Sequence, residues 1–278
     1  MSGCALDVRS PEEARDAVAG WLVRKTGQAV EERSDGMLVG FAPGAAQADA
    51  LIAELLATFG GAVAGRARAL PEIAWHELWR DGIRPRTIGR LTVGPSWAIP
   101  TTRDPASATV VIDPETAFGT GEHGSTRTAL ILLDRYVRPG DRVLDLGSGS
   151  GILAIAAARL GAARATGVEW EEESEPVARK NVERNGVAAR VALVTGDAAV
   201  LAPLLGPVEL VLSNILRASN VALLPSITAA LAPGGVAIFA GMEEAEREPF
   251  LALLGAAGCE ALDEAVDDGW WGVAARRR

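Results

Sequence analysis

Short apolar segments alternate with longer amphipathic segments through the second half of the chain. Apolar runs of strand length end near residues 112, 146, 168, 194, 212 and 240, and helical patterns lie between them, including 128–137, 152–158 and 221–231. Short apolar runs are typical of buried strands, and their alternation with helices predicts an α/β fold with a parallel sheet. A hairpin of 259–266 and 271–275, turning at 267–269, ends the chain. We therefore expect a doubly wound, Rossmann-like domain.

A different order of elements precedes this domain. Residues 5–9, 29–32, 37–41 and 62–69 have strand patterns, and helices are expected from Ser10-Pro11 to about Arg24 and over 46–59. The order βαββαβ is that of a small ferredoxin-like α+β unit. Residues 71–100 are expected to connect the two, with Trp75 and Trp79 on one face of a short helix and a strand at 91–93. We predict a ferredoxin-like domain at 1–70, a linker at 71–100 and a catalytic domain at 101–278.

The strand that ends at Leu146 runs into a turn with three glycines. They lie at 147, 149 and 151, and an alanine-rich helix begins at Ile152. Glycine permits positive φ and leaves no side chain between the turn and a ligand. A dinucleotide-binding turn needs its third glycine five positions after the first, where this chain has Ile152. The observed spacing, preceded by Asp145, is instead typical of methyltransferases that use S-adenosylmethionine, which the sequence therefore favours as cofactor.

Polar residues stand at the ends of three later strands. Glu169 lies 22 positions after Gly147, close to the offset at which an acid binds ribose hydroxyls. Asp197 ends the next strand, where its carboxylate could reach the adenine amino group. Asn214 ends the strand after that, and its carbonyl oxygen could accept a hydrogen bond from an amine. Because open α/β sheets bind ligands at the carboxyl ends of their strands, we expect these side chains at one site.

The segment 113–127, ahead of the glycine turn, is rich in glycines and hydroxyl groups and leads into the helix expected from Thr128. A helix N-terminus lined with hydroxyls offers backbone N–H groups to a carboxylate or phosphate. Since the glycine turn follows shortly afterwards, we expect this loop and the turn to share a ligand.

The composition narrows the classes of protein that these motifs allow. Of the 278 residues, 49% are hydrophobic and 23% are charged, which is ordinary for a globular protein. No apolar run reaches the roughly 18 residues of a membrane span, and the start of the chain lacks the regions of a signal peptide. A net charge of −9 argues against non-specific nucleic-acid binding, and two histidines exclude a histidine-rich metal site. With only Cys4 and Cys259 there is no disulfide framework, so we expect a cytoplasmic protein with neither metal nor membrane contact.

In these motifs the chain resembles the PrmA-type bacterial methyltransferases of ribosomal large-subunit protein eleven. The matching residues are Ala117-Phe118-Gly119-Thr120-Gly121, His123, Ser125, Thr126, the stretch 145–157, Asn181, Asn185-Gly186-Val187 and Asn214-Ile215-Leu216. The match is clear from about residue 75 onwards and extends to the first 70 residues only in layout. The resemblance implies a class I S-adenosylmethionine-dependent domain that methylates lysine side chains and the N-terminal amine of the ribosomal protein. It also implies an N-terminal domain that recognises this protein.

The resemblance assigns Thr126, Gly147, Glu169 and Asn214 to the cofactor, and the motifs add Asp145, Gly149 and Asp197. Asn214 is also the expected catalytic residue, because it would accept hydrogen bonds from the amine and orient its lone pair. Alignment is then the main task, and burial lowers the pKa of the amine, so that no strong base is required. We expect the ribosomal protein as partner, no direct contact with nucleic acid, and a monomer.

This chain departs from the family pattern at four places, which are Glu169 for the usual aspartate, Trp170-Glu171-Glu172 for its usual continuation, Ser125 for a threonine and Arg217 for a small residue. A longer acid can still bind a ribose, whereas Arg217 is expected near the site of a cationic amine. The alternative substrates are another protein lysine or a small amine. The alternative classes are a cofactor-binding module without turnover and a nicotinamide dehydrogenase, which Ile152 disfavours.

Overall fold

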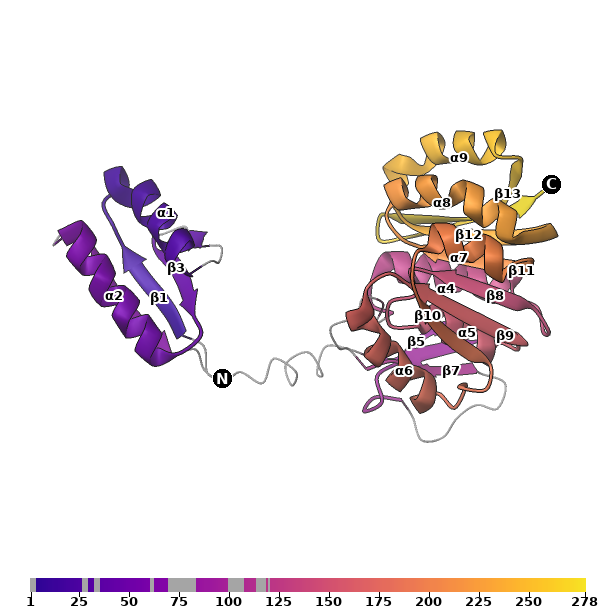
Figure 1. The fold of residues 1–278 in the computed structure, drawn as a ribbon, viewed down its shortest axis with the longest axis horizontal. Helices are drawn as coiled ribbons and strands as arrows, with labels where there is room; N and C mark the ends of the chain where they lie inside the picture. The colour runs from indigo at the N-terminus through magenta and orange to yellow at the C-terminus, as the bar shows by residue number, and fades with distance from the viewer. Residues whose placement is uncertain are drawn as a thin grey trace. The chain divides into compact units, whose positions relative to one another are not determined.

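The structure is a computed structural model that describes residues 4–26, 30–32, 36–60, 63–69, 84–99, 108–113, 119 and 121–278. The chain divides into two compact units, 1–82 and 83–278 (Figure 1). Each unit has its own cluster of buried hydrophobic residues. The helix predicted around Trp75 and Trp79 lies outside the described residues. Among the residues that are described, no helix is long and apolar enough to cross a membrane.

The first unit follows the predicted βαββαβ order. Its elements are β1 (Cys4–Arg9), the 3-10 turn η1 (Glu12–Ala14), α1 (Arg15–Thr26), β2 (Glu31–Glu32), β3 (Leu38–Ala42), α2 (Ala45–Phe59) and β4 (Ala64–Ala69). The strands form an antiparallel sheet in the order β2-β3-β1-β4. Leu6 of β1 packs with Leu22 of α1 and Leu55 of α2 in one buried cluster. This strand order is that of a split βαβ arrangement, which supports the ferredoxin-like prediction.

The second unit is built on a seven-stranded sheet in the order β10-β9-β8-β11-β12-β14-β13. Its strands are β8 (Arg142–Leu146), β9 (Arg164–Glu169), β10 (Val191–Thr195), β11 (Val208–Asn214), β12 (Leu231–Glu243), β13 (Cys259–Asp267) and β14 (Trp270–Arg277). The first five are parallel, and β14 is antiparallel to both of its neighbours. The chain leaves β8 on one side for β9 and later returns on the other side as β11, so a topological switch point lies at β8. Ligands of such sheets bind at this point, beyond the carboxyl ends of the strands.

Helices cover both faces of this sheet, as the alternating pattern predicts. They are α4 (Gly124–Tyr136), α5 (Ile152–Arg159), η3 (Glu172–Ser174), α6 (Glu175–Arg184), α7 (Ala198–Leu205), α8 (Arg217–Ala230), η4 (Glu244–Glu246) and α9 (Arg247–Ala256). One core cluster joins the sheet to α4, α5 and α6, and a second joins it to α7, α8 and α9. The α/β, Rossmann-like prediction is therefore confirmed, and the antiparallel β14 distinguishes this sheet from the 3-2-1-4-5-6 order of dinucleotide-binding domains.

A small second sheet extends the unit beyond the predicted catalytic segment. It consists of β5 (Arg86–Ile88), β6 (Leu91–Gly94) and β7 (Ala108–Val111). Leu91 and Val93 are buried in the same core cluster as Leu130 of α4 and Ile155 of α5. Residues 86–94, which the sequence places in the linker, are thus part of the second unit, while the assignment of a role to each of the three segments stays a prediction.

Two helices begin earlier than the patterns indicate. Helix α4 begins at Gly124 rather than near Thr128, and α8 begins at Arg217 rather than near Val221. Glycine and hydroxyl residues are poor helix formers, but the first turn of α4 is buried, and Thr128 Oγ1 donates to the carbonyl oxygen of Ser125 at 2.8 Å. Tertiary packing therefore extends α4 over Ser125 and Thr126, which lie inside the helix.

Candidate active site

Two adjoining cavities open where β8, β9 and β11 end. The larger has a volume of about 600 Å³ and the smaller about 410 Å³, and Gly147, Glu169 and Ile215 line both. The larger is also lined by His123, Ser125, Gly149, Asn214, Leu216 and Trp270, and the smaller by Trp170, Gly196, Asp197, Ala199 and Leu223. Of the predicted site residues, the structure therefore brings Gly147, Gly149, Glu169, Asp197 and Asn214 together, at the switch point of the sheet.

Position 147 in the glycine turn leaves no room for a side chain. Gly147 has a φ of +71°, and a Cβ at this position would lie 2.5 Å from Cγ2 of Ile215. Its backbone N–H donates to the carbonyl oxygen of Val168 at 2.8 Å, which ties the turn to β9. A larger residue here would strain the backbone and displace Ile215, so that a Gly147→Val variant would change the shape of both cavities.

The carboxylate of Glu169 connects the glycine turn to the end of β9. Its Oε2 accepts from the backbone N–H of Gly149 at 2.8 Å, and its Oε1 accepts from those of Trp170 at 2.8 Å and Glu171 at 3.1 Å. A carboxylate has about four acceptor positions, so Glu169 retains capacity for a further donor from the cavity. Its predicted contact with a ribose is compatible with this geometry and stays a prediction.

Asp145 lies beneath the turn rather than in a cavity wall. Its side chain is 1% exposed, and its Oδ2 accepts from the backbone N–H of Ala154 at 3.0 Å, which joins β8 to α5. Its Oδ1 is buried without a partner among the described residues. Burial raises the pKa of this carboxyl to about 7, and the nearby charge of Glu169 acts in the same direction. This placement indicates support of the turn, and direct contact of Asp145 with a ligand stays a prediction.

We expect the buried carboxyl of Asp145 to make the protein less stable as the pH rises. Between the ordinary pKa of 3.8 and the folded value of about 7, the native state keeps a proton that the unfolded chain has lost. The free energy of unfolding therefore falls across this window as pH increases. Relative to Asp145→Asn, which does not titrate, the wild type should lose about 2–3 kcal/mol between about pH 5 and pH 8. Urea unfolding of both proteins at several pH values measures this difference, and parallel curves would contradict it.

Asn214 presents an acceptor that has no partner within the described chain. Its Nδ2 donates to Oγ1 of Thr126 at 3.4 Å, and Thr126 is fully buried in the first turn of α4. Its Oδ1 is buried and unpartnered, and the residue lines the larger cavity. A buried oxygen of this kind is costly unless a ligand supplies a donor. The site is thus suited to a ligand that brings N–H or O–H groups to Asn214.

The loop that carries Asn214 is held from behind by Asn220, which the sequence does not indicate. Asn220 is fully buried; its Nδ2 donates to the carbonyl oxygens of Ile215 and Ala240 at 3.0 Å each, and its Oδ1 accepts from Ser213 Oγ at 2.7 Å. Gly241 lets β12 approach the same loop, because a Cβ there would lie 2.3 Å from the Ile215 carbonyl oxygen. Arg217 follows this loop and is not among the residues that line either cavity. The replacement of the family's usual small residue by Arg217 therefore adds no positive charge to the lining of the cavities.

We expect Asn220→Ala to lower the free energy of unfolding by about 3 kcal/mol, because two buried carbonyl oxygens and one hydroxyl lose their partner. Ser213→Ala removes only one of these bonds and should cost about 1 kcal/mol. Chemical unfolding of both variants measures the two losses, and equal losses would show that the carbonyl contacts of Asn220 contribute nothing.

The loop ahead of α4 is hydrogen-bonded to the glycine turn, whereas the ligand that the two are expected to share stays a prediction. Ser150 Oγ donates to the carbonyl oxygen of Gly119 at 2.6 Å, and the carbonyl oxygen of Ser150 accepts from Asn181 Nδ2 at 3.1 Å. Asn185 holds β7 through both the N–H and the carbonyl oxygen of Val111, at 2.8 and 2.7 Å. The matching residues 117, 118 and 120 lie outside the described part of the chain.

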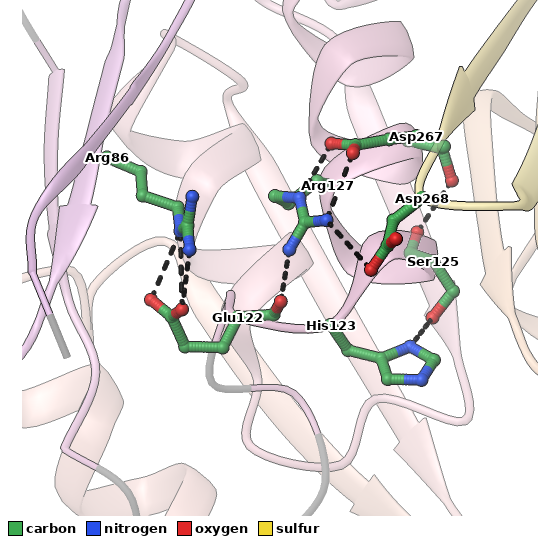
Figure 2. Close-up of polar contacts among 8 residues, drawn as sticks. Arg86, Glu122, His123, Ser125, Arg127, Asp267 and Asp268 are labelled. Atoms are coloured by element: carbon green, nitrogen blue, oxygen red, sulfur yellow. Dashed lines mark hydrogen bonds and ion pairs between the residues drawn. The ribbon is translucent and has the colours of Figure 1, made fainter. Parts of the chain in front are cut away.

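Two aromatic rings in contact, those of His123 and Trp270, line one side of the larger cavity. The ring centroids of His123 and Trp270 lie 4.4 Å apart, and the ring planes are tilted by 58°. Figure 2 shows the contact of His123 Nδ1 with Ser125 Oγ, at 2.8 Å. In the sequence, Trp270 stands only beside the turn of the predicted hairpin, and no local pattern connects it to His123. Its position between a turn glycine and a strand tryptophan is too common a pattern to mark a site.

Comparison with known proteins agrees with this geometry. The sequence model of the family "Ribosomal protein L11 methyltransferase (PrmA)" matches residues 19–278. A ribosomal protein L11 methyltransferase of Pelotomaculum thermopropionicum is 40% identical over 228 residues, which cover 82% of this chain and 72% of that protein. One of Thermus thermophilus is 40% identical over 197 residues, 70% of this chain and 74% of that protein.

A solved structure shares the fold as well. The crystal structure of ribosomal protein L11 methylase from Lactobacillus delbrueckii superposes with a TM-score of 0.63 at 27% identity and covers 70% of this chain and 100% of that one. The chain therefore belongs to the ribosomal protein L11 methyltransferase family, whose members transfer methyl groups from S-adenosylmethionine.

Proposed function

We propose that this chain methylates amino groups of ribosomal protein L11, including lysine side chains and the N-terminal amine. The observation that carries the proposal is Asn214, which lines the larger cavity beside the glycine turn and whose buried Oδ1 has no hydrogen-bond partner among the described residues. An amine nitrogen can donate to this oxygen, whereas a carboxylate or carbonyl substrate would leave it unsatisfied. Relatives that align with more than two thirds of this chain bear the name of this activity.

The two cavities divide the binding task between them. We assign the smaller cavity, with Trp170 and Asp197, to the adenosine part of S-adenosylmethionine and the larger cavity, with Asn214, to the acceptor amine. Glu169 lines both cavities, and its carboxylate can accept a further hydrogen bond from the hydroxyl groups of a ribose that lies between them. When bound, the cofactor supplies a methyl group on a positively charged sulfur.

The residues of the larger cavity prepare the amine for attack in line with the bond that breaks. An unperturbed lysine has a pKa of about 10.4, and burial beside the positively charged sulfur of the cofactor would disfavour its charged form. Asn214 would accept one N–H of the neutral amine and thereby direct the nitrogen lone pair. Alignment of this kind accounts for the rate without a dedicated base, since holding reactants in attack geometry removes much of the entropic barrier.

Transfer to purified ribosomal protein L11 tests the proposal directly. The full chain is incubated with L11 and labelled S-adenosylmethionine, and mass spectrometry of L11 peptides should locate methyl groups on lysine and N-terminal amines. Label on a different protein or on a small amine only would reject L11 as substrate. Calorimetry with S-adenosylhomocysteine is the separate check of the cofactor, and a lack of binding would reject the assignment of the cavities.

We also propose that Trp170 provides a face for the adenine ring. Its side chain is 69% exposed although it lines the smaller cavity, and Glu169 fixes its backbone N–H. Stacking of a base on an aromatic ring is worth about 1–3 kcal/mol. We expect Trp170→Ala to weaken S-adenosylhomocysteine binding by this amount in calorimetry and Trp170→Phe to retain most of the affinity. Trp97→Ala, at an exposed tryptophan outside both cavities, should leave affinity unchanged, and equal affinities of all variants would exclude stacking.

A further inference from the structure

The rings of His123 and Trp270 contact each other and line the larger cavity, although they come from segments that are far apart in the sequence. His123 immediately precedes α4, and Trp270 begins β14 after the turn of the terminal hairpin. Gly124 allows the two to touch, since a Cβ there would lie 2.6 Å from the carbonyl oxygen of Asp267 and 2.7 Å from Cδ1 of Trp270. Such a close approach of the hairpin turn to the start of α4 requires a contact that joins the two segments.

Arg127 binds both segments at once. Its Nε and Nη2 form a two-point ion pair with Asp267 at 2.6 and 3.0 Å, and its Nη1 donates to the carbonyl oxygen of Glu122 (Figure 2). The Arg127 side chain is only 12% exposed. The interaction raises the pKa of Arg127 and lowers that of Asp267, as expected where each stabilises the charge of the other.

A second ion pair holds Glu122, the residue whose carbonyl oxygen accepts from Arg127. Arg86 of β5 contacts the Glu122 carboxylate, with Nη2 2.8 Å and Nε 3.2 Å from its oxygens. Glu122 is therefore held through its side chain by Arg86 and through its backbone by Arg127. Since Glu122 directly precedes His123, both contacts restrict where the His123 ring can lie.

We propose that Arg127 is a positioning residue for the acceptor amine, which acts by keeping the His123 and Trp270 rings in the wall of the larger cavity. The inference rests on the proposed function, because it assigns this cavity to the amine. This role requires an arginine. One planar guanidinium donates to two carboxylate oxygens and a carbonyl oxygen at once, and a lysine ammonium does not reproduce this geometry.

The chain offers a matched control on the same two elements. Arg135 lies two turns further along α4, and its Nη1 contacts Asp263 of β13 at 3.0 Å, but the side chain is 50% exposed. Arg135→Met thus removes an ion pair between the same helix and hairpin without touching the wall. A comparison with Arg127→Met separates positioning from a general loss of helix–hairpin contact.

The experiment measures three quantities on the full chain for Arg127→Met, Arg127→Lys and Arg135→Met. These are the calorimetric affinity for S-adenosylhomocysteine, kcat and KM for methyl transfer to L11, and hydrogen exchange of the hairpin amides. We expect Arg127→Met to lower kcat/KM roughly 10- to 100-fold, since a misplaced group far from the chemistry can have this effect, with cofactor affinity within about twofold. Arg127→Lys should lie between it and the wild type, exchange at residues 267–270 should rise in both, and Arg135→Met should match the wild type in activity.

Other outcomes overturn the proposal while leaving the proposed function standing. If Arg127→Met transfers methyl groups to L11 as the wild type does, or if Arg135→Met loses as much activity, Arg127 has no positioning role. An additive double variant of Arg127→Met and Asp267→Asn would also contradict it, because one shared contact can be lost only once. Failure of the wild type to methylate L11 would instead reject the proposed function.

Discussion

Asn214→Leu is expected to lower kcat for methyl transfer about 100- to 1,000-fold, the loss seen when one preorganised polar group is removed from a reaction centre. Leucine is close to asparagine in size, so the cavity keeps its volume while the buried, unpartnered oxygen of Asn214 disappears. The affinity for S-adenosylhomocysteine should change far less than kcat, because that ligand contains no acceptor amine for methylation. Single-turnover transfer to L11, combined with calorimetry, measures the two effects separately.

Thr126→Val is the matched comparison for this variant. It removes the hydroxyl that receives Asn214 Nδ2 at 3.4 Å but leaves the Asn214 acceptor in place. A smaller loss of kcat, about tenfold, is expected because the amide is then less well oriented. If Asn214→Leu retained wild-type kcat, the amine would not bind at Asn214, and the assignment of the larger cavity would fail even though the family membership stands.

The residues that local patterns could predict are those at the ends of strands. Gly147, Glu169 and Asn214 each follow an apolar run, and parallel strands end at one edge of the sheet, so their proximity follows from the fold class. The three residues line one cavity in the structure, and the ligand that each binds stays a prediction. Asp145 belongs to the same motif, yet its side chain is buried beneath the glycine turn, where its Oδ2 accepts from the backbone N–H of Ala154 in α5.

The residues that could not be predicted owe their place to contacts between distant segments. Asn220 lies within α8, and no local sequence pattern distinguishes it from a solvent-exposed asparagine. Its contacts with the carbonyl oxygens of Ile215 and Ala240 form only in the folded chain. Likewise, the pairing of Arg127 with Asp267 joins residues 140 positions apart. The strand β5 lies outside the patterns because it has only three residues, of which Ile88 alone is buried.

Removal of residues 1–82 is expected to reduce methylation of intact L11 about 100-fold or more while leaving the catalytic unit able to bind its cofactor. The first unit has its own buried cluster, and the described residues that line the two cavities belong to the second unit, so each unit should fold separately. If the first unit binds the ribosomal protein, it raises the effective concentration of the acceptor at the site, which is worth about 10²- to 10⁴-fold for linked binding events. Loss of this tethering should appear in KM for L11 rather than in the affinity for S-adenosylhomocysteine.

A short lysine peptide provides the control for the truncation, because it is too small to be recognised by a separate domain. We expect the full chain and residues 83–278 to methylate this peptide at the same rate at equal concentration. Calorimetry with S-adenosylhomocysteine should give the same affinity for both proteins, which also shows that the truncated protein is folded. If residues 83–278 methylated intact L11 as efficiently as the full chain, the first unit would not select the substrate. Recognition would then have to lie in the second unit, with the hairpin that carries Trp270 and the mouth of the larger cavity as the surface to vary next.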